Sequence, residues 1–489
     1  RGINLRFKKW ISATAASLLL ATSLSVAPIQ AEETRKIADE SIYDLLVDRY
    51  FNGSGQNDVD VNTQDPTQFA GGDFAGLVSR GESIVALGYT IVSIGSVFAT
   101  EKYDGSLPTS YTELEPHFGT AEELTTVIDY FNGKKMEVMV DFPLSNVSAY
   151  HEWATNTDWI AATANGQIQF DLENPDVQAA LKNALVEFVS AYDFGGVRLT
   201  NIDGASEAFL NELIAAIKNV DDAIYVIANG ESNANFDADF HEDTHTLFKD
   251  AFKDVDLSTE AVTKYVDSGN KPSQLFMDSI WTNRFTYDVM ETGNEYPPNR
   301  LPLAYAATLL MPGVAVTQYG TEIGMNGVAG PESHQYYNFK TDEEFIDKIS
   351  NIQLLRNQSW TLRNGEFTIL KNEDGFLAFE RKSDDEHWII VINNTSITNR
   401  IDLKEELIGK DKELRGMFES DIIRVNKDGN YPVILDREMF EMYQVIDKTG
   451  INTSYVVALA IVYILFTAFV ITVVKRGRKR RAEQDAQQQ

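Results

Sequence analysis

The chain has 489 residues, of which 43% are hydrophobic and 11% aromatic, so it can bury a large core and is not a disordered protein. Its formal net charge of −31 argues against nucleic acid and anionic polymers as ligands, and it suits neutral sugars or calcium. The sequence has no cysteine, which excludes disulfides and thiolate metal sites. In an exported protein this is typical of a Gram-positive bacterial surface.

The first 31 residues have the order of a secretory signal peptide. Basic residues precede the apolar run Ile11–Val26, and a small residue, Ala31, stands at the expected cleavage position. An uncleaved N-terminal anchor would show much the same order. We expect a signal peptide over residues 1–31.

Between residues 42 and 318, short β-rich apolar runs alternate with amphipathic helical stretches such as Ala121–Phe131 and Val177–Tyr192. This alternation predicts a parallel sheet covered by helices. About eight such units over about 280 residues predict an α/β fold of the (β/α)8 TIM-barrel type, with the chemistry on loops at the C-terminal ends of the strands. The predicted strand runs are Ile42–Val47, Tyr89–Ile94, Glu137–Val140, Gly196–Leu199, Ala223–Ala228, Gln274–Met277 and Val314–Gln318.

After about residue 366 the pattern changes to period-two alternation, as in Phe376–Glu380 and Trp388–Ile392, which predicts a C-terminal all-β sandwich. The expected domains are therefore a barrel over 32–366 with a short inserted loop domain, a β-sandwich over 367–446 and a polar stalk over 447–454.

Residues 455–474 carry no charge and would span roughly 30 Å as a helix, the thickness of a bilayer core. The basic segment 475–489 follows at once, which predicts a single transmembrane helix with a cytoplasmic C-terminus and an extracellular ectodomain. A buried core helix is the alternative. Without the signal peptide and the tail, residues 32–474 carry a net charge of −39.

Six short motifs follow one another in order along the predicted barrel. They are Val47-Asp48-Arg49-Tyr50, Glu115-Pro116-His117-Phe118-Gly119-Thr120, Val138-Met139-Val140-Asp141, Asp171-Leu172-Glu173-Asn174-Pro175, Gly195-Gly196-Val197-Arg198-Leu199-Thr200 and Tyr319-Gly320-Thr321-Glu322-Ile323-Gly324. In this order they resemble the alpha-amylase superfamily (family 13 glycoside hydrolases) over residues 42–445. The resemblance implies the barrel and sandwich described above, and a role in carbohydrate metabolism.

The catalytic positions of that family are largely lost. Retaining glycosidases need a carboxylate nucleophile and a carboxyl proton donor, and the family adds a third, stabilising acid. The resemblance places the nucleophile at Thr200, the proton donor at Glu231 and the stabilising acid at Trp281. A threonine hydroxyl without a base cannot replace a carboxylate, and loss of a nucleophile costs several powers of ten in rate. Asp203 is an alternative acid, but an ordinary position in a surface loop is the favoured interpretation.

Other residues at the expected barrel mouth are candidates for substrate binding. The resemblance implies this for Asp141 and Arg198, which in the family are usually structural partners, and for Asn146 and Tyr319. Histidine and tyrosine positions of the family hold other residues here. The aromatic rings that could stack on a sugar, or simply pack, are those of Trp281, Tyr319 and Phe285.

The loop after the first predicted strand resembles the calcium loop of many bacterial amylases. Calcium takes six to eight oxygen ligands. The oxygens would come from Asn52, Ser54, Asn57, Asp58, Gly71 and Asp73. An ordinary polar turn rich in glycine and asparagine would show the same sequence pattern. We expect the loop to bind a structural calcium ion.

Together these patterns predict a membrane-anchored, cell-surface member of the alpha-amylase family that is a pseudoenzyme and binds an alpha-glucan (a maltooligosaccharide) or a partner protein. The alternative is an active alpha-glucan hydrolase or transglycosylase that uses Glu231 and a repositioned acid. A third possibility is an adaptor in which the barrel is only a scaffold for protein contacts.

Overall fold

The computed structural model describes residues 35–487 except 267–270, 294–295, 342 and 449–452. The predicted signal peptide and part of the predicted stalk lie outside the described residues.

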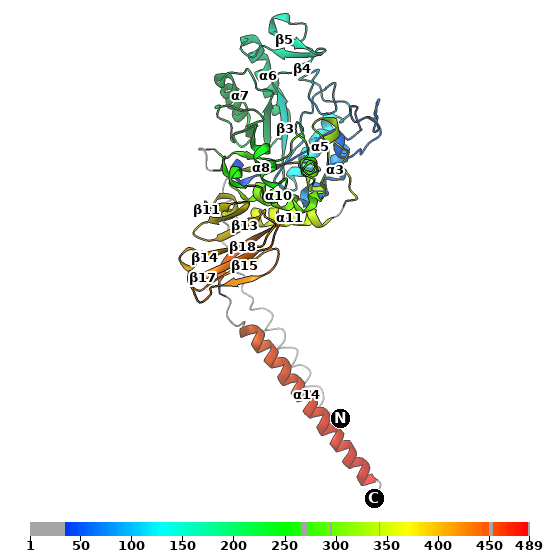
Figure 1. Cartoon of the computed structure of the whole chain (residues 1–489). Coiled ribbons are helices and arrows are strands. Elements are labelled where there is room, and N and C mark those ends of the chain that lie inside the picture. Colours follow the sequence, from blue (N-terminus) through cyan, green and yellow to red (C-terminus); the bar gives the residue numbers. More distant parts are fainter. Residues whose placement is uncertain (1–34, 267–270, 294–295, 342, 449–452, 488–489) are drawn as a thin grey trace. The chain divides into compact units, whose positions relative to one another are not determined.

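A parallel sheet of seven strands forms the centre of the N-terminal part, in the order β8-β7-β3-β2-β1-β10-β9 (Figure 1). Its two ends are joined by residues 237–239, where the Asp237 amide donates to the Val226 carbonyl at 2.8 Å and the Gln274 amide donates to the Asp239 carbonyl at 2.9 Å. The sheet therefore closes into the predicted (β/α)8 barrel. The strands are β1 (Ser41–Asp44), β2 (Ile91–Ser93), β3 (Glu137–Pro143), β7 (Gly196–Thr200), β8 (Tyr225–Ala228), β9 (Gln274–Leu275) and β10 (Val314–Gln318).

Apolar side chains fill the inside of the barrel because parallel strands are buried on both faces. One buried cluster draws a residue from almost every strand. Gly196 of β7 makes room in it, since a Cβ there would lie 2.6 Å from Cε of Met139. The members of the cluster include Ile42, Ile91, Met139, Ile227, Ala238, Phe276, Val314 and Val316.

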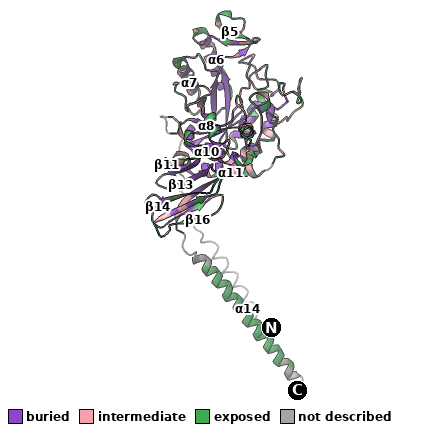
Figure 2. Cartoon of the chain, viewed as in Figure 1, coloured by how far each residue is buried: buried purple, intermediate pink, exposed green. Residues whose placement is uncertain are grey.

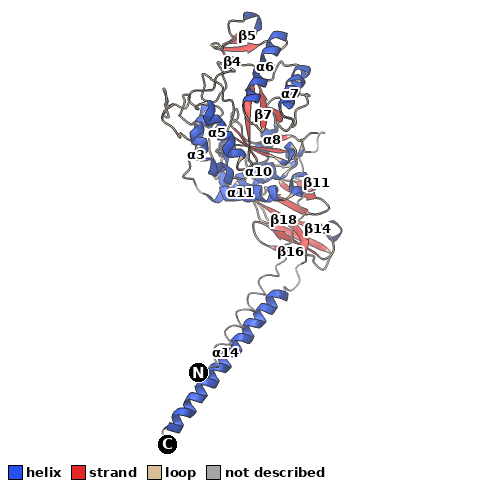
Figure 3. Cartoon of the chain, turned by 180° about the vertical axis from the view of Figure 1, so that it is seen from behind, coloured by secondary structure: helices blue, strands red, loops and turns tan. Residues whose placement is uncertain are grey.

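Helices cover the outside of the sheet (Figure 3). Local sequence explains where several begin: Thr120 and Glu123 form a capping box at α5, and Asn174 caps α6 before a proline in its first turn. The helices are α2 (Val47–Tyr50), α3 (Phe74–Ser79), α4 (Gly81–Ala86), α5 (Ala121–Asn132), α6 (Pro175–Ala191), α7 (Glu207–Val220), α8 (Thr244–Phe252), α9 (Phe285–Glu291), α10 (Leu301–Leu310), α11 (Glu343–Gln358) and α12 (Trp360–Asn364).

Several strand ends differ from the prediction by a few residues, and at the first strand the type of element changes as well. The first strand ends at Asp44, not Val47, and Val47–Tyr50 is one turn of helix (α2). After β3 a small antiparallel sheet is inserted in the order β4-β6-β5, made of β4 (Val147–Ser148), β5 (Ile160–Ala164) and β6 (Gln167–Phe170).

The C-terminal part is all-β, apart from the short α13 (Glu405–Ile408), as predicted. A six-stranded sheet, β11-β12-β13-β18-β15-β16, and the pair β14-β17 enclose their own apolar cluster. This part is bonded to the barrel: the Asn394 side chain donates to the Ala251 carbonyl at 2.7 Å. The strands are β11 (Glu366–Glu373), β12 (Phe376–Lys382), β13 (His387–Asn393), β14 (Asn399–Lys404), β15 (Lys412–Gly416), β16 (Ile422–Arg424), β17 (Asn430–Leu435) and β18 (Met439–Asp447).

The last element is the helix α14 (Thr453–Gln487). Within it Val456–Ala482 is long and apolar enough to cross a membrane, judged by length and a mean hydropathy of 2.8, and none of that stretch is buried (Figure 2).

Candidate functional site

Two buried acids and one arginine meet at the C-terminal ends of three barrel strands, β1, β3 and β7. Arg198 of β7 donates from Nε and Nη2 to both oxygens of Asp141 on β3, at 2.7 and 2.8 Å. Its Nη1 and Nη2 donate to the two oxygens of Asp44 on β1, at 2.9 and 3.0 Å. All three side chains are buried. The arrangement uses the whole guanidinium fork.

This cluster is suited to holding strands together and not to acid–base chemistry. It carries one net negative charge, and burial raises the pKa of Asp141 although the Arg198 charge opposes the shift. Both Asp141 oxygens accept from Arg198, and Asp44 takes two further N–H groups, so four of the five guanidinium N–H groups are already used within the cluster.

Thr200, in the position of the nucleophile, is the last residue of β7 and is buried. Its carbonyl accepts from the Leu144 amide at 2.9 Å. Asp203, the alternative acid, lies three residues on in an exposed loop. If Thr200 occupies the nucleophile position, as the sequence predicts, that position holds a neutral hydroxyl and not a carboxylate.

Asn146 connects the loops after β3 and β7. Its side-chain amide donates to Oδ1 of Asn201 at 3.4 Å, and the Asn201 amide donates to the Ser145 carbonyl at 3.1 Å. Both asparagines have positive φ, 59° and 50°, which asparagine tolerates better than most residues. The pair ties two loops beside Thr200.

Glu231, in the position of the proton donor, is exposed in the loop after β8. Its Oε1 accepts from the Glu242 amide at 3.3 Å. Trp281, in the position of the stabilising acid, is 54% exposed and borders a pocket of about 300 Å³ together with His245, Thr246, Lys249, Asp250, Thr282, Asn283, Asp288 and Ala329.

Two of the three rings that could stack on a sugar are not accessible to a ligand. Tyr319 and Phe285 are both fully buried. Arg284 lies 5.3 Å from the centre of the Tyr319 ring, and the Tyr319 hydroxyl donates to the Gln335 carbonyl at 3.1 Å. The burial of Tyr319 counts against the predicted substrate contact and favours the packing alternative, because a fully buried ring offers no face to a ligand.

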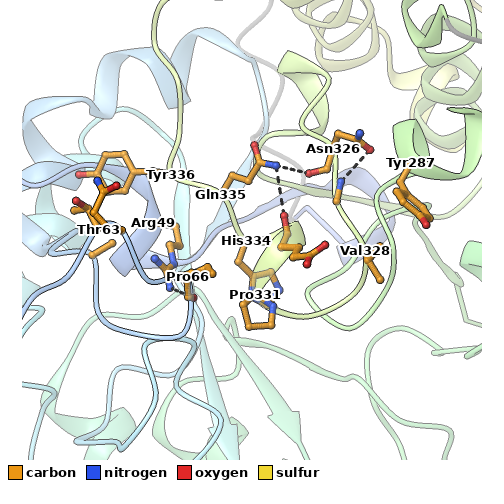
Figure 4. Close-up of a pocket in the computed structure, with 14 residues that line it drawn as sticks. Arg49, Thr63, Pro66, Tyr287, Asn326, Val328, Pro331, His334, Gln335 and Tyr336 are labelled. Atoms are coloured by element: carbon orange, nitrogen blue, oxygen red, sulfur yellow. Dashed lines mark hydrogen bonds between the residues drawn. The ribbon is translucent and has the colours of Figure 1, made fainter.

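A pocket of about 590 Å³ lies between the loop after β1 and the loop after β10 (Figure 4). Arg49 forms part of one wall, and its Nη2 donates to the carbonyls of Pro66 and Gln68 at 2.7 and 2.9 Å. The other lining residues are Thr63, Gln64, Pro66, Ala70, Tyr287, Asn326, Gly327, Val328, Pro331, Glu332, His334, Gln335 and Tyr336.

Behind this pocket Tyr103 joins the loops after β2 and β10. Its ring lies 3.7 Å from the Arg49 guanidinium carbon, and its hydroxyl is 2.8 Å from Nδ1 of His334. Nε2 of His334 is 2.7 Å from the Ile280 carbonyl, which can only accept. The proton of the neutral ring is therefore on Nε2, and Nδ1 accepts from Tyr103. Burial lowers the pKa of His334 to about 4.

Sequence reasoning missed Tyr103 and His334. The resemblance places the family's stacking tyrosine at Ser106. Tyr103, three residues earlier, was therefore not predicted as a site residue. The scarcity of histidine, six in the chain, was the available signal for His334.

The six residues predicted to bind calcium come together in the loop after β1. The Asn52 amide donates to the Asp58 oxygens at 2.8 and 3.0 Å, and Asp73 accepts from the amides of Gly53, Ser54 and Gly76 at 2.9, 2.8 and 2.6 Å. Asn57 donates to the His117 carbonyl. Gly71 has φ of 90°, and a Cβ there would lie 2.8 Å from an Asp58 oxygen.

The charges of this loop fit a cation. Burial raises the pKa of Asp73, and no lysine or arginine of the described residues pairs with Asp58 or Asp73. Only two of the six predicted ligands are carboxylates, and no cluster of three or more acidic or histidine side chains suited to a metal occurs in the described ranges. Amide, hydroxyl and carbonyl oxygens would have to complete the coordination.

Comparison with known proteins links this site to one family. The family described as "Alpha amylase, catalytic domain" matches residues 44–159, and "Alpha-amylase C-terminal domain" matches residues 365–443. A Beta/alpha-amylase of Paenibacillus polymyxa is 24% identical over 73% of this chain, which spans only a third (33%) of that relative's length.

Two solved structures are similar over most of the chain. An alpha-amylase from Anoxybacillus superposes with a TM-score of 0.80 at 29% identity, covering 85% of this chain and 100% of that one. The alpha-amylase of Geobacillus thermoleovorans, solved in complex with acarbose, superposes with a TM-score of 0.79 at 28% identity and the same coverage.

Proposed function

The chain belongs to the alpha-amylase superfamily, and from this membership we propose that it is a non-catalytic, membrane-anchored member that binds alpha-glucans at the cell surface. The binding site would be the mouth of the barrel.

The state of the catalytic positions carries this proposal. Thr200 and Trp281 stand where the mechanism needs two carboxylates, and Arg198 gives all its hydrogen bonds at the mouth to Asp44 and Asp141. A single remaining acid, Glu231, can protonate a leaving group but cannot form the glycosyl intermediate. Loss of two of three acids should remove catalysis.

An alpha-glucan is the ligand that the mouth suits best. The pocket between the loops after β1 and β10 offers hydroxyl, amide and guanidinium groups next to the ring of Tyr336, which is 39% exposed (Figure 4). Such a mixture matches a sugar, with an apolar ring face and hydroxyl edges. The related Geobacillus enzyme was solved with acarbose, which supports the same ligand class. A partner protein at the mouth is the other possible ligand.

The anchor would be α14. Val456–Ala482 includes the uncharged run followed by six basic residues, the order of a helix that stops in the membrane with its C-terminus in the cytoplasm. The barrel and sandwich would then lie outside the cell.

Calcium would stabilise the loop after β1. Asp58 and Asp73 would supply charge, and the oxygens of Asn52, Ser54, Asn57 and Gly71 would complete the site. Bound calcium would add folding stability and take no part in chemistry.

An active hydrolase is the second candidate, favoured by the retained Glu231 and by relatives named as amylases. It would need a second carboxylate brought to the mouth, since Asp141 is fully bonded to Arg198.

One experiment separates the candidates. Full-length protein in detergent and its Glu231→Gln variant are incubated with maltoheptaose, and reducing ends are counted while binding is followed by calorimetry. We expect binding without turnover, and weaker binding in Tyr336→Ala than in Tyr150→Ala, an exposed tyrosine (81%) of the inserted segment. Turnover that Glu231→Gln abolishes would establish the hydrolase. Neither binding nor turnover would leave a partner protein as the ligand.

A further inference from the structure

We propose a second carbohydrate-binding site, separate from the barrel mouth, centred on Trp360 at the junction of the barrel and the β-sandwich. The choice of an alpha-glucan as its ligand rests on the proposed function; the site itself rests on the observations that follow.

The site lies at the end of the barrel opposite the mouth. Trp360 is the first residue of α12, and two residues of the same helix, Arg363 and Asn364, donate to Oδ1 of Asp39 at 3.0 and 2.5 Å. Asp39 lies two residues before β1. It therefore marks the N-terminal end of the strands, whereas the mouth is formed by loops at their C-terminal ends.

Trp360 borders a pocket of about 410 Å³. The pocket lies between α12, the start of β11 and the turn that joins β12 to β13, and its other lining residues are Asn364, Gly365, Glu366, Lys382, Ser383, Asp384 and Asp385. The Trp360 ring is 49% exposed. A large apolar ring at the edge of a polar pocket is the arrangement that recognises the face of a pyranose.

The base of the pocket is held in place. Oγ of Ser359 caps α12 by accepting from the Leu362 amide at 3.0 Å and also donates to Glu386 in the β12–β13 turn. The hydroxyls of Thr361 and Ser383 are 2.7 Å apart. These hydrogen bonds hold α12 and the β12–β13 turn together before any ligand binds. Ligand binding therefore requires little additional ordering of the backbone.

The rim offers hydrogen-bonding groups that no other side chain uses. Glu366, Lys382, Asp384 and Asp385 are exposed, and none of them has a hydrogen-bond partner for its side chain among the described residues. Carboxylates accept from sugar hydroxyls, and the ammonium group donates to sugar oxygens. Three carboxylates and one lysine give the rim a net negative charge, which disfavours an anionic ligand. A neutral chain of hexoses therefore fits best.

Two sites on one molecule have a consequence for polymer binding. A long glucan that occupies one site raises the local concentration of glucose units at the other, so a polysaccharide gains affinity that a trisaccharide does not. Trp360 should therefore matter more for amylopectin than for maltotriose binding at the mouth.

The test compares full-length protein in detergent with Trp360→Ala, Trp360→Phe and Leu354→Ala, the last an exposed (52%) apolar residue of α11. Affinity electrophoresis through amylopectin measures polymer binding, and the melting temperature checks folding. We expect Trp360→Ala to weaken retention by amylopectin about tenfold, Trp360→Phe to restore most of it and Leu354→Ala to have no effect.

The outcomes separate this site from the mouth. Amylopectin retention unchanged in Trp360→Ala but reduced in Tyr336→Ala would overturn the Trp360 site and leave the proposed function standing. Retention that depends on Trp360 alone would support the site and count against glucan binding at the mouth. If the unaltered protein is not retained at all, both proposals fail.

Discussion

Arg198 holds Asp141 by two parallel hydrogen bonds, Nε to Oδ1 at 2.7 Å and Nη2 to Oδ2 at 2.8 Å, while the rest of its guanidinium group holds Asp44. Three strand ends are thus fastened by one buried side chain. Thr200, the residue that we assign to the nucleophile position, lies two residues further along the same strand, and the contacts of Arg198 indicate a structural role.

Replacing Arg198 by methionine should destabilise the barrel by about 3–5 kcal/mol, because it leaves two buried carboxylates without a positive partner. Urea denaturation followed by circular dichroism measures the change. Arg400→Met is the control, since Arg400 donates from Nε and Nη2 to one oxygen of Asp402 on an exposed surface and its loss should change stability by no more than about 1 kcal/mol. Equal effects of the two variants would contradict a structural role for the cluster.

Thr200→Asp should not create a glycosidase. Residues two apart on a strand point to the same side, so the new carboxylate would join Asp44 and Asp141 around one arginine, and the stabilising acid would still be missing at position 281. We expect turnover of maltoheptaose to stay at background and the melting temperature to fall below that of Thr200→Val. Robust turnover by Thr200→Asp alone would show that the site needs only its nucleophile.

Acid should weaken the fold through two buried histidines. Burial lowers the pKa values of His151 and His334 from 6.5 to about 4. The unfolded chain therefore binds more protons between these values, so their stabilising contribution is complete above pH 6.5 and is lost as pH falls towards 4. Each contributes on the order of 3 kcal/mol.

Denaturation of the unaltered protein and of His334→Gln at pH 7 and pH 4.5 measures this effect. The variant should lose less stability between the two pH values, because a glutamine keeps polar contacts but takes up no proton. Asp48, whose pKa burial raises to about 6, acts in the opposite sense, so only the difference between the two proteins isolates His334. Parallel pH profiles would contradict the assignment.

Calcium should raise the thermal stability of the protein. At a free concentration one hundredfold above its Kd a ligand adds about 2.7 kcal/mol. Melting curves with millimolar calcium and with a chelator test this, and Asp58→Asn should remove most of the difference. This variant keeps Asp73, which caps α3, so its own fold is preserved. Identical curves with calcium and chelator would exclude the metal from this loop.

Removal of α14 should release the protein from membranes. The full chain is expected in the pellet after an alkaline carbonate wash, and a chain ending at Lys448 in the supernatant, because only α14 combines length and apolarity sufficient to span a bilayer in the part of the chain that the structure describes. The same distribution for both proteins would contradict a C-terminal anchor.

Most of the fold was predictable because its signals are local. Buried parallel strands read as continuous apolar runs, and seven of them were found. The sixth strand position of the barrel, Asp237-Ala238-Asp239, was not, because two acids interrupt it and only its neighbours β8 and β9 define it as part of the sheet. The predicted loss of the catalytic acids also rests on the sequence alone, since it depends only on residue type at the motif positions.

Orientation and long-range contact belong to the tertiary structure alone. A motif placed Tyr319 and Phe285 near the mouth, but packing turned both rings inward. Tyr103 meets His334 across 231 positions of sequence, and the pocket at Trp360 exists because α12 docks on the β12–β13 turn. The sequence by itself thus determined which elements form and which residue types occupy the motif positions, because both depend on residue type and short spacing. Which side chains share a pocket was decided only when the strands closed into a barrel and brought distant loops together.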